Sequence, residues 1–323
     1  MRGALTVTLL VIAAALFAAK LLIRAPEASE PDAASGRQTV TVFSPDAWAA
    51  QETEVLPAQR TRRPLCYNIL LCGRDGAGGG SDTMLLMRFD AGARRIDLTS
   101  LPRDTLLHHE WYSNKLNYAF ASGGVELLRT EVENLLGVPV DYYISVDLAG
   151  FAALVDSIGG VDFEVPADMD YDDPAQDLHI HYAAGYQHLG GQQALEVVRW
   201  RKNNDGSGYP GADLGRIATQ QAFLRAAAEQ ALRPGNAPAL ARVLLAYVKT
   251  DLTAGNLVWL ANAALDVGTA GVAFHTLPGD GAGCWRRESV YVLDPEATLA
   301  LVNEALNPYT LPIEAEETDI LVP

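Results

Sequence analysis

The segment that most constrains the fold is an apolar run, "YNILLCG", at residues 67–73, which stops at a glycine. Such a nearly continuous apolar run is typical of a strand that is buried on both faces of a sheet. Strand signals and helical periodicity alternate through most of the remaining chain. Because such a sheet needs helices on each side, we predict an α/β fold with a central mixed β-sheet covered by helices on both faces.

The expected elements follow from apolar periodicity and from Gly and Pro stops. Besides residues 67–73, strands are expected at 83–90, 95–101, 141–148 and 161–166, with residues 91–94 forming a hairpin turn between the second and third. Helices are expected at 122–138, 148–160, 190–202, 213–232, 241–252 and 294–306, the first of them with a Ser122 cap and a Gly stop. His179 and His181 are expected to alternate along a further strand.

The N-terminal segment is apolar almost without interruption from Ala4 to Ile23. About 20 such residues cross a hydrocarbon core of about 30 Å, so residues 1–24 are predicted to be a transmembrane signal-anchor. A cleaved signal peptide is the alternative, although its apolar core is usually shorter, about 7–15 residues. Residues 25–63 are rich in Ala, Pro, Ser, Asp and Glu and are expected to form a stalk, and residues 310–323 a flexible acidic tail.

Charge and cysteine content exclude several classes of protein. The formal net charge of −16 argues against non-specific nucleic-acid binding, which requires a basic face. Cys66 and Cys72 lie six residues apart on one expected strand, about 20 Å, and therefore cannot pair with each other. A disulfide between one of them and Cys284 stays open. The cysteine spacing fits neither a zinc site nor a disulfide-rich scaffold.

An ordered series of motifs resembles the LytR–CpsA–Psr family. The series comprises "CGRD…GSDTMLLMRFD", "LPRDT", "KLNYAF", "SVDLAGFAALVDSIGGVDFEVP", "LHIHYAAGYQHLGGQQALEVVRWRK" and "DLGRIATQQAFL". The resemblance implies a catalytic domain at residues 64–309, on the extracytoplasmic side of a bacterial cell membrane that the anchor crosses once. It further implies a phosphotransferase that moves a glycopolymer from an undecaprenyl-pyrophosphate carrier to peptidoglycan and forms a phosphodiester.

Four arginines are the expected clamp for the pyrophosphate. Arg103 follows an expected strand, Arg199 and Arg201 lie two residues apart, and Arg216 begins the next helix. Arginine donates planar bidentate hydrogen bonds to phosphate and stays charged, although surface pairing with carboxylates would explain any single one of them. Arg199 and Arg201 can face the same way only if their segment is extended, as at a helix end. The match to the family favours the clamp.

The resemblance places the metal ligands at Asp75 and Asp82, on either side of the loop "GAGGGS". Two carboxylates that meet across a Gly-rich turn suit a hard cation, Mg²⁺ or Mn²⁺, although both residues could instead serve as turn caps. The family usually carries an arginine where this chain has Gly80, just before Ser81. Arg74 is the expected replacement, but adjacent strand residues point to opposite faces. Thr219 also stands where relatives often have a basic residue.

The remaining polar candidates are Asp104, Lys115, Gln220 and two histidines. Asp104 is expected either to orient Arg103 or to accept the proton of the acceptor hydroxyl. The resemblance implies that Lys115 and Gln220 contact the pyrophosphate, and Gln220 shares a helical face with Arg216. His179 and His181 would share one strand face, but without a third ligand nearby they are interpreted as structural.

Apolar helices beside this polar set are expected to line a channel for the lipid. The predicted function is metal-assisted phosphotransfer from the lipid-linked donor to peptidoglycan. Two alternatives stay open: a lipid-pyrophosphate hydrolase that uses water as acceptor, and a non-catalytic polyprenyl-lipid-binding regulator of the cell envelope.

Overall fold

A six-stranded mixed sheet organises the computed structural model, which describes residues 23–29, 38–42, 51–55, 60–74, 81–108, 113–175, 178–209, 213–231, 233, 242–243 and 246–320. The strand order is β11-β6-β3-β4-β5-β12. These strands are β3 (Cys66–Arg74), β4 (Ser81–Asp90), β5 (Arg95–Ser100), β6 (Tyr142–Asp147), β11 (Val248–Thr250) and β12 (Val272–Thr276). β3 runs parallel to β6 and β5 parallel to β12, whereas the other neighbours are antiparallel. The prediction of a mixed central sheet is confirmed.

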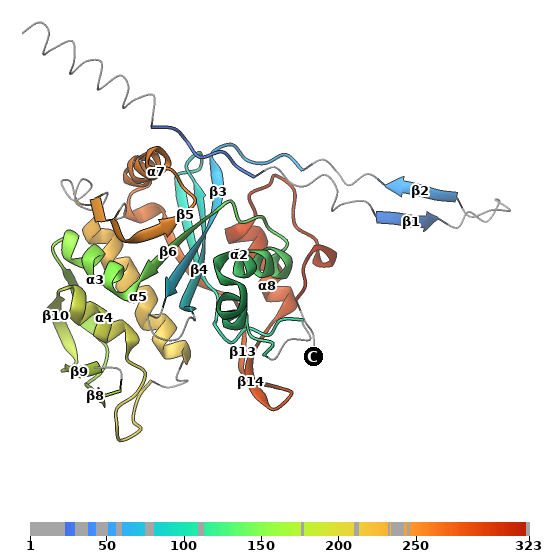
Figure 1. The fold of residues 1–323 in the computed structure, drawn as a ribbon. Coiled ribbons are helices and arrows are strands. Elements are labelled where there is room, and N and C mark those ends of the chain that lie inside the picture. Colours follow the sequence, from blue (N-terminus) through green and yellow to red (C-terminus); the bar gives the residue numbers. More distant parts are fainter. Residues whose placement is uncertain are drawn as a thin grey trace, which may run out of the picture.

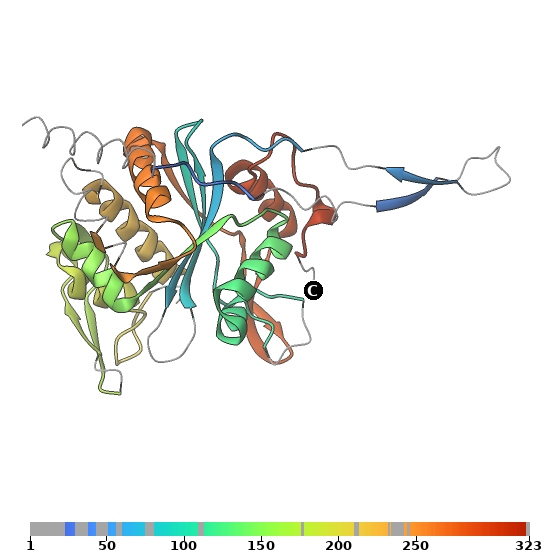
Figure 2. The ribbon, with the colours of Figure 1, turned by 45° about the horizontal axis from the view of Figure 1, so that its top comes forward.

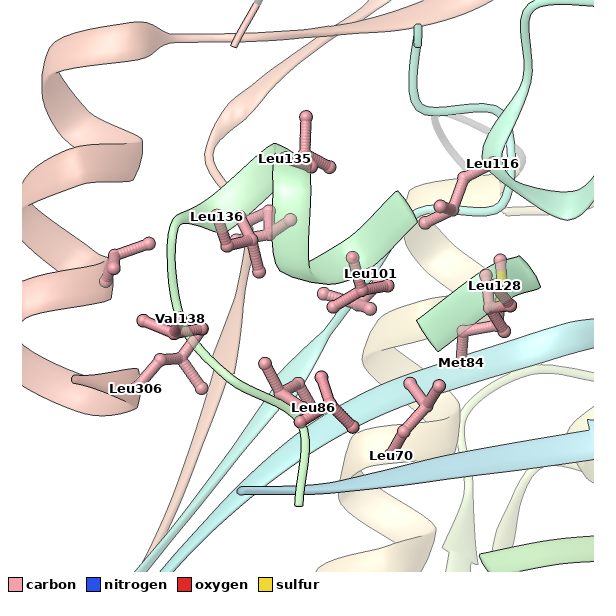
Figure 3. Close-up of a cluster of buried hydrophobic side chains, with 14 of the residues drawn as sticks. Leu70, Met84, Leu86, Leu101, Leu116, Leu128, Leu135, Leu136, Val138 and Leu306 are labelled. Carbon is pink, nitrogen blue, oxygen red and sulfur yellow. The ribbon is translucent and has the colours of Figure 1, made fainter. Parts of the chain in front are cut away.

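Helices cover both faces of the sheet, as its alternating side chains require. On one face, Leu70 and Leu86 pack in a buried cluster with α2 (Leu116–Leu136) and the C-terminal helix α8 (Pro295–Leu301) (Figure 3). On the other face, Ile69 and Phe89 pack against α7 (Ala254–Val267). Figure 2 shows the sheet nearly edge-on between these two layers. The prediction of helices on both faces is confirmed.

A second group of elements packs beside the α7 layer (Figure 1). It consists of α3 (Leu148–Ser157), β7 (Val161–Val165), β8 (Met169–Asp173), β9 (Leu178–Tyr182), β10 (Gly185–Leu189), α4 (Gly191–Arg199) and α5 (Asp213–Ala231). β7 pairs with β10 and β8 with β9 as antiparallel ribbons. Their inward faces share one apolar core with the helices, which includes Phe163, Ile180, Trp200 and Phe223. We call this unit the ribbon lobe.

The remaining elements lie toward the ends of the described chain. β1 (Gln38–Val42) pairs with β2 (Gln51–Val55), and β13 (Gly279–Trp285) pairs with β14 (Glu288–Leu293). A 3-10 turn spans Thr269–Gly271, a π-helical turn spans Val302–Leu306, and a second 3-10 turn spans Ala315–Glu317. The cysteines Cys66, Cys72 and Cys284 are all free thiols, so the disulfide left open from the sequence is not formed.

Several expected element boundaries are corrected. Helix α2 joins two helical segments at a kink: a segment that was not predicted begins at Leu116, and Gly124, with φ 69° and ψ −157°, separates it from the helix expected from Ser122. It ends, as expected, at a glycine: Gly137 adopts a left-handed conformation. Val248–Thr250, expected within a helix, forms the edge strand β11 because it pairs with β6. Helix α7 was missed, although Thr253 and Asn256 form a capping box at its start.

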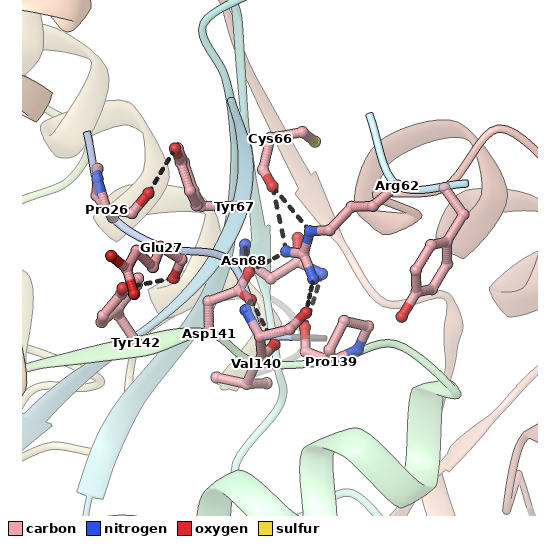
Figure 4. A network of polar contacts seen from close by, with 12 residues as sticks. Pro26, Glu27, Arg62, Cys66, Tyr67, Asn68, Pro139, Val140, Asp141 and Tyr142 are labelled. Atoms are coloured by element: carbon pink, nitrogen blue, oxygen red, sulfur yellow. Dashed lines mark hydrogen bonds and ion pairs between the residues drawn. The ribbon is translucent and has the colours of Figure 1, made fainter. Parts of the chain in front are cut away.

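The expected stalk is not a free linker at its two ends (Figure 4). Ser29 donates its backbone N–H to Asp141 over 2.8 Å, and Arg62 forms an ion pair with the same carboxylate. Tyr67 Oη donates to the backbone oxygen of Pro26 over 2.9 Å. Residues 25–29 and 60–63 are therefore fastened to the sheet, which corrects the expectation of a stalk throughout residues 25–63.

The expected flexible tail also packs against the domain through residue 320. Ile313 is buried in the α2 cluster, and Ile320 packs against that cluster. Asn303 Nδ2 donates to the backbone oxygen of Ile313 over 2.9 Å, and Arg60 pairs with Glu317. The acidic composition of residues 310–320 led to a wrong prediction of a flexible tail, because apolar residues between the acidic ones pack against the domain.

The expected membrane anchor, residues 1–24, lies almost wholly outside the described residues. Within the part of the chain that the structure describes, no helix combines the length and the apolar character needed to span a bilayer.

Candidate functional site

A cavity of about 1010 Å³ lies between the sheet and the ribbon lobe. Its sheet wall comes from β3, β4 and β6, where Leu71 and Leu85 continue the face that α7 covers farther along. Its opposite wall comes from the ribbon lobe. The apolar side chains that line it include Leu71, Leu85, Ile144, Val146, Leu148, Phe151, Leu154, Leu178, Ile180, Leu195, Val198, Trp200, Phe223 and Leu224. The cavity is therefore predominantly apolar and large for a small-molecule site.

Arg74 and Asp147 lie where the parallel strands β3 and β6 end, and both line the cavity. Their side chains form an ion pair at 3.4 Å. Asp147 also caps α3, because its carboxylate accepts from the backbone N–H of Gly150 over 2.8 Å. The strand register shifts between Gly73 and Arg74, and both residues line the cavity. Simple alternation had made the position of Arg74 doubtful.

Arg199 and Arg201 both line the cavity. Helix α4 ends at Arg199, and Trp200 is extended with φ −60° and ψ 139°. Trp200 is buried in the ribbon-lobe core and also lines the cavity, and the residues on either side of an extended position point the same way. The two arginines therefore share one side for the reason expected from the sequence, an extended segment at a helix end. Lys202 also lines the cavity and was missed, although it follows Arg201 directly.

Arg216 and Gln220 lie one turn apart on α5 and line the same cavity. Arg216 is only 5% exposed, so its guanidinium is a largely desolvated charge in the cavity wall. Gln220 Nε2 donates to the backbone oxygen of Val198 over 3.1 Å, which ties α5 to α4. The shared helical face expected from the spacing is confirmed.

Arg103 lies beside the cavity rather than in its lining. It borders a small neighbouring pocket of about 10 Å³, whose wall includes Arg216 and Gln220. Gln221, which the sequence reading missed, holds α5 to the strand ends beside this pocket. Its Nε2 donates to Ser100 Oγ over 2.9 Å and to the backbone oxygen of His275 over 2.7 Å.

Asp104 joins Arg103 and Lys115. Its Oδ1 atom is 3.3 Å from Lys115 Nζ and 3.8 Å from Arg103 Nε. Lys115 occupies the N-cap position of α2, so the carboxylate links the turn after β5 to that helix. Of the two roles expected for Asp104, this geometry favours positioning of the two cations.

Thr219, where the family resemblance leads us to expect a basic residue, supplies no charge. It is buried on α5, and its hydroxyl donates to Tyr209 Oη over 2.8 Å. Tyr209 lines the cavity, and burial raises the pKa of its phenol. The pair is thus an uncharged part of the wall.

The expected metal ligands are the least described part of the site. Asp75 and Gly80 lie outside the described residues, and Asp82 is described only by its backbone in β4. The residues that precede the two aspartates, Arg74 and Ser81, pair with each other in the strand register.

His179 and His181 have the third ligand that the sequence reading did not find. Across the β8–β9 ribbon, Asp172 brings its carboxylate within reach of both imidazoles. All three side chains are exposed, on the face of the ribbon away from the cavity.

The sequence of this chain is similar to those of known proteins. The LytR_cpsA_psr family model matches residues 38–307. The polyisoprenyl-teichoic acid–peptidoglycan teichoic acid transferase TagU of Bacillus cereus is 36% identical over 194 residues, which cover 58% of this chain and 60% of TagU. TagU of Bacillus licheniformis is 29% identical over 223 residues, 67% of this chain and 69% of that protein.

Solved structures share the fold. Crystal structures of a transcriptional regulator from Enterococcus faecalis and of TagV from B. subtilis are each 25% identical to this chain. Their TM-scores are 0.66 and 0.59, and they cover 78% and 72% of this chain and 91% and 92% of their own. Because the family model spans most of the chain, this protein belongs to the LytR–CpsA–Psr family.

Proposed function

We propose that this protein transfers a glycopolymer from an undecaprenyl-pyrophosphate carrier to peptidoglycan and forms a phosphodiester. The observation that carries the proposal is a single cavity in which a long apolar lining meets the cations Arg74, Arg199, Arg201 and Arg216. A polyprenyl pyrophosphate has the same two parts, an apolar chain and a multiply charged head. The name of the TagU relatives gives a polyisoprenyl-linked teichoic acid as the donor and peptidoglycan as the acceptor.

The apolar lining suits the polyprenyl chain. Phe151, Ile180 and Phe223 belong to different elements of the ribbon lobe and converge on the cavity. Burying apolar ligand surface stabilises a complex by roughly 25 cal/mol per Å² before ordering costs are subtracted. The volume of about 1010 Å³ is at the upper end for small-molecule sites, so it admits a substantial length of lipid.

The arginines suit the pyrophosphate. Arginine forks donate paired hydrogen bonds to phosphate oxygens, and these bonds are stronger in a site that excludes water. Arg216 is nearly buried, and Arg199 and Arg201 approach from the end of α4. In our proposal these side chains bind the diphosphate, while Arg103 binds from the neighbouring pocket and Lys115, linked to Arg103 through Asp104, binds beside it.

In the proposed reaction, the acceptor hydroxyl oxygen bonds to the phosphorus that carries the glycan. The bond between this phosphorus and the bridging oxygen breaks, and undecaprenyl phosphate leaves. The leaving phosphate gains negative charge and can take up the hydroxyl proton. Because charge is spread over the phosphoryl oxygens, preorganised cations are the main catalytic contribution that this chain can make.

A divalent cation is part of the proposal. In the sequence, Asp75 directly follows Arg74 and Asp82 directly follows Ser81, and Arg74 and Ser81 pair with each other in the strand register. Two carboxylates offer the hard oxygen ligands that Mg²⁺ or Mn²⁺ prefers. When bound, such an ion would supply charge neutralisation at the diphosphate. We further propose that residues 1–24 anchor the protein in the bacterial cell membrane, with the domain outside.

The proposal is tested by incubating the full chain in detergent with a purified lipid-linked pyrophosphate glycan and peptidoglycan fragments. We expect a phosphodiester-linked product that requires Mg²⁺ or Mn²⁺, and its loss in Arg103→Ala and Arg201→Ala. Lys249→Ala is the matched control, because Lys249 is exposed on β11 and does not line the cavity.

Each other outcome overturns a stated part of the proposal. Release of free phosphorylated glycan without transfer indicates hydrolysis. Tight lipid binding without either product indicates a non-catalytic regulator. Full transfer by both arginine variants would refute the assignment of the site.

A further inference from the structure

The outer face of the β8–β9 ribbon carries four polar side chains on two adjacent rungs. Asp170 pairs with His181 and Asp172 with His179 in the strand register. Alternate residues of the same strands, such as Ile180, face the cavity instead. The strand pairing therefore gathers two imidazoles and two carboxylates on one exposed surface, separated by one layer of backbone from the lipid-facing wall.

The spacing of these groups suits a small cation. One ligand atom from each of Asp172, His179 and His181 lies within 4.8 Å of the others. His181 Nε2 is 3.4 Å from Asp172 Oδ1. Tetrahedral zinc with bonds of about 2.0–2.1 Å holds its ligand atoms roughly 3.3 Å apart. His179 Nδ1, at 2.5 Å from Asp172 Oδ1, would have to move away by about 0.8 Å on this geometry, which an exposed side chain can do.

Asp170 orients the imidazole ring of His181 toward Asp172, as a metal ligand needs. Its Oδ1 atom is 2.7 Å from His181 Nδ1, while the other ring nitrogen of His181 faces Asp172. A carboxylate on one imidazole nitrogen fixes the proton there and leaves the opposite lone pair for a metal, the arrangement common around zinc-bound histidines. The ring is thus already oriented toward the centre of the cluster.

The backbone beneath the cluster is fixed. Asn203 Oδ1 accepts from the backbone N–H of Asp170 over 2.7 Å, and Asn204 Oδ1 accepts from that of Asp172 over 2.8 Å. These asparagines directly follow the segment that carries Arg201 and Lys202. A ribbon held in this way keeps its ligands close together, which reduces the entropic cost of binding an ion.

We propose that Asp172, His179 and His181 form a binding site for a transition-metal ion of the zinc class, with Asp170 positioning His181. Water completes the coordination because the cluster is exposed. Two imidazoles favour Zn²⁺ over the hard cations Mg²⁺ and Mn²⁺, so this site differs in kind from the carboxylate pair proposed at Asp75 and Asp82. A bound ion would brace the outer face of a ribbon whose inner face walls the cavity.

The test is a Zn²⁺ titration of the metal-stripped full chain in detergent, with a chromophoric chelator as competitor and with excess Mg²⁺ to occupy carboxylate-only sites. We expect one zinc per chain. Asp172→Asn and His181→Gln should each lose at least about 100-fold in affinity, because each removes one of three ligands. Asp170→Asn should lose about 10–100-fold, the usual cost of removing an orienting carboxylate.

His188→Gln is the matched control. His188 is equally exposed and pairs with one carboxylate, Asp162, at 2.8 Å, but among the described residues it belongs to no group of three metal-ligating side chains. Its substitution should leave zinc affinity unchanged. Absence of stoichiometric zinc binding, or equal affinity in wild type, Asp172→Asn and His181→Gln, would overturn the proposal. Equal losses in His188→Gln and His181→Gln would do the same, since they would show only non-specific histidine binding.

Discussion

Replacement of Asp141 by alanine should destabilise the protein more than the removal of any single exposed ion pair would. Asp141 Oδ1 accepts from Ser29 N–H over 2.8 Å, and its Oδ2 accepts from Asn68 N–H over 2.8 Å and pairs with Arg62. The Asp141 side chain is fully buried and that of Arg62 is 12% exposed. The substitution therefore leaves a nearly buried guanidinium without its carboxylate and a buried amide without its acceptor (Figure 4).

Breaking a buried ion pair from one side costs about 3–5 kcal/mol. For a domain of this size, each kcal/mol shifts the melting temperature by roughly 2–4 °C, so a fall of about 6–20 °C is expected. The assay is calorimetric unfolding of the full chain in detergent. Asp162→Ala, which removes an exposed partner of His188, is the control and should cost less than about 1 kcal/mol.

Two results would refute this reasoning. One is an Asp141→Ala variant that unfolds within about 1 kcal/mol of wild type. The other is strict additivity of Asp141→Ala and Arg62→Met, because residues in one buried network should show a coupling energy of about 0.5–3 kcal/mol. Either outcome would mean that residues 25–29 and 60–63 are not held to the sheet by this carboxylate.

Three further predictions concern packing, thiol chemistry and pH. Gly191→Ala should destabilise the protein by about 1–3 kcal/mol, because the added Cβ would overlap the backbone oxygen of Ala152. Gly190→Ala is the control: its added Cβ would have no neighbour closer than 3.6 Å, so it should cost under about 1 kcal/mol. Urea unfolding measures both. Burial raises the pKa of the Cys66 thiol and of the Cys72 thiol to about 12. Iodoacetamide at pH 8 should therefore label only the exposed Cys284 in the native protein. Three labels per chain in mass spectrometry would contradict this. Burial opposes ionisation of Asp97, but hydrogen bonds from Arg95 and His275 outweigh it and lower the pKa of this carboxyl below the ordinary 3.8. The ionised carboxylate therefore contributes fully to the free energy of unfolding above pH 3.8, and this contribution is lost as the pH falls toward the lower folded-state pKa. Asp97→Asn should therefore flatten the acid limb of the stability curve, and an unchanged slope would show that this carboxylate does not govern it.

The strands β3, β4, β5 and β6 of the central sheet could be predicted, because buried strands have a local pattern of apolar residues that the sequence shows. Strand β12 was missed. The run at 67–73 became β3, and the turn at 91–94 became the β4–β5 connection. The shared side of Arg199 and Arg201 was also predictable, because it depends only on where one helix ends. Strand β11 was not, because its pairing with β6 overrides a local helical pattern.

The cavity could not be derived from periodicity. Ile180 and Phe223 both line the cavity. In the sequence they are apolar residues on faces expected to be buried, and that pattern is the same whether such residues pack against each other or line a cavity. The register shift between Gly73 and Arg74 also cannot be seen in the alternation of apolar and polar residues. Asp172 joined the two histidines only through cross-strand pairing, a contact between residues on opposite sides of a turn. Sequence spacing alone does not give that register.

The central claim, that this cavity binds a polyprenyl chain and the arginines bind its pyrophosphate, is tested most directly by a crystal structure of the protein with geranylgeranyl pyrophosphate. The account predicts isoprenoid density between Phe151 and Ile180, with both phosphates within hydrogen-bond distance of Arg199, Arg201 or Arg216. Isoprenoid density outside the cavity, or phosphates that contact none of these arginines, would contradict it.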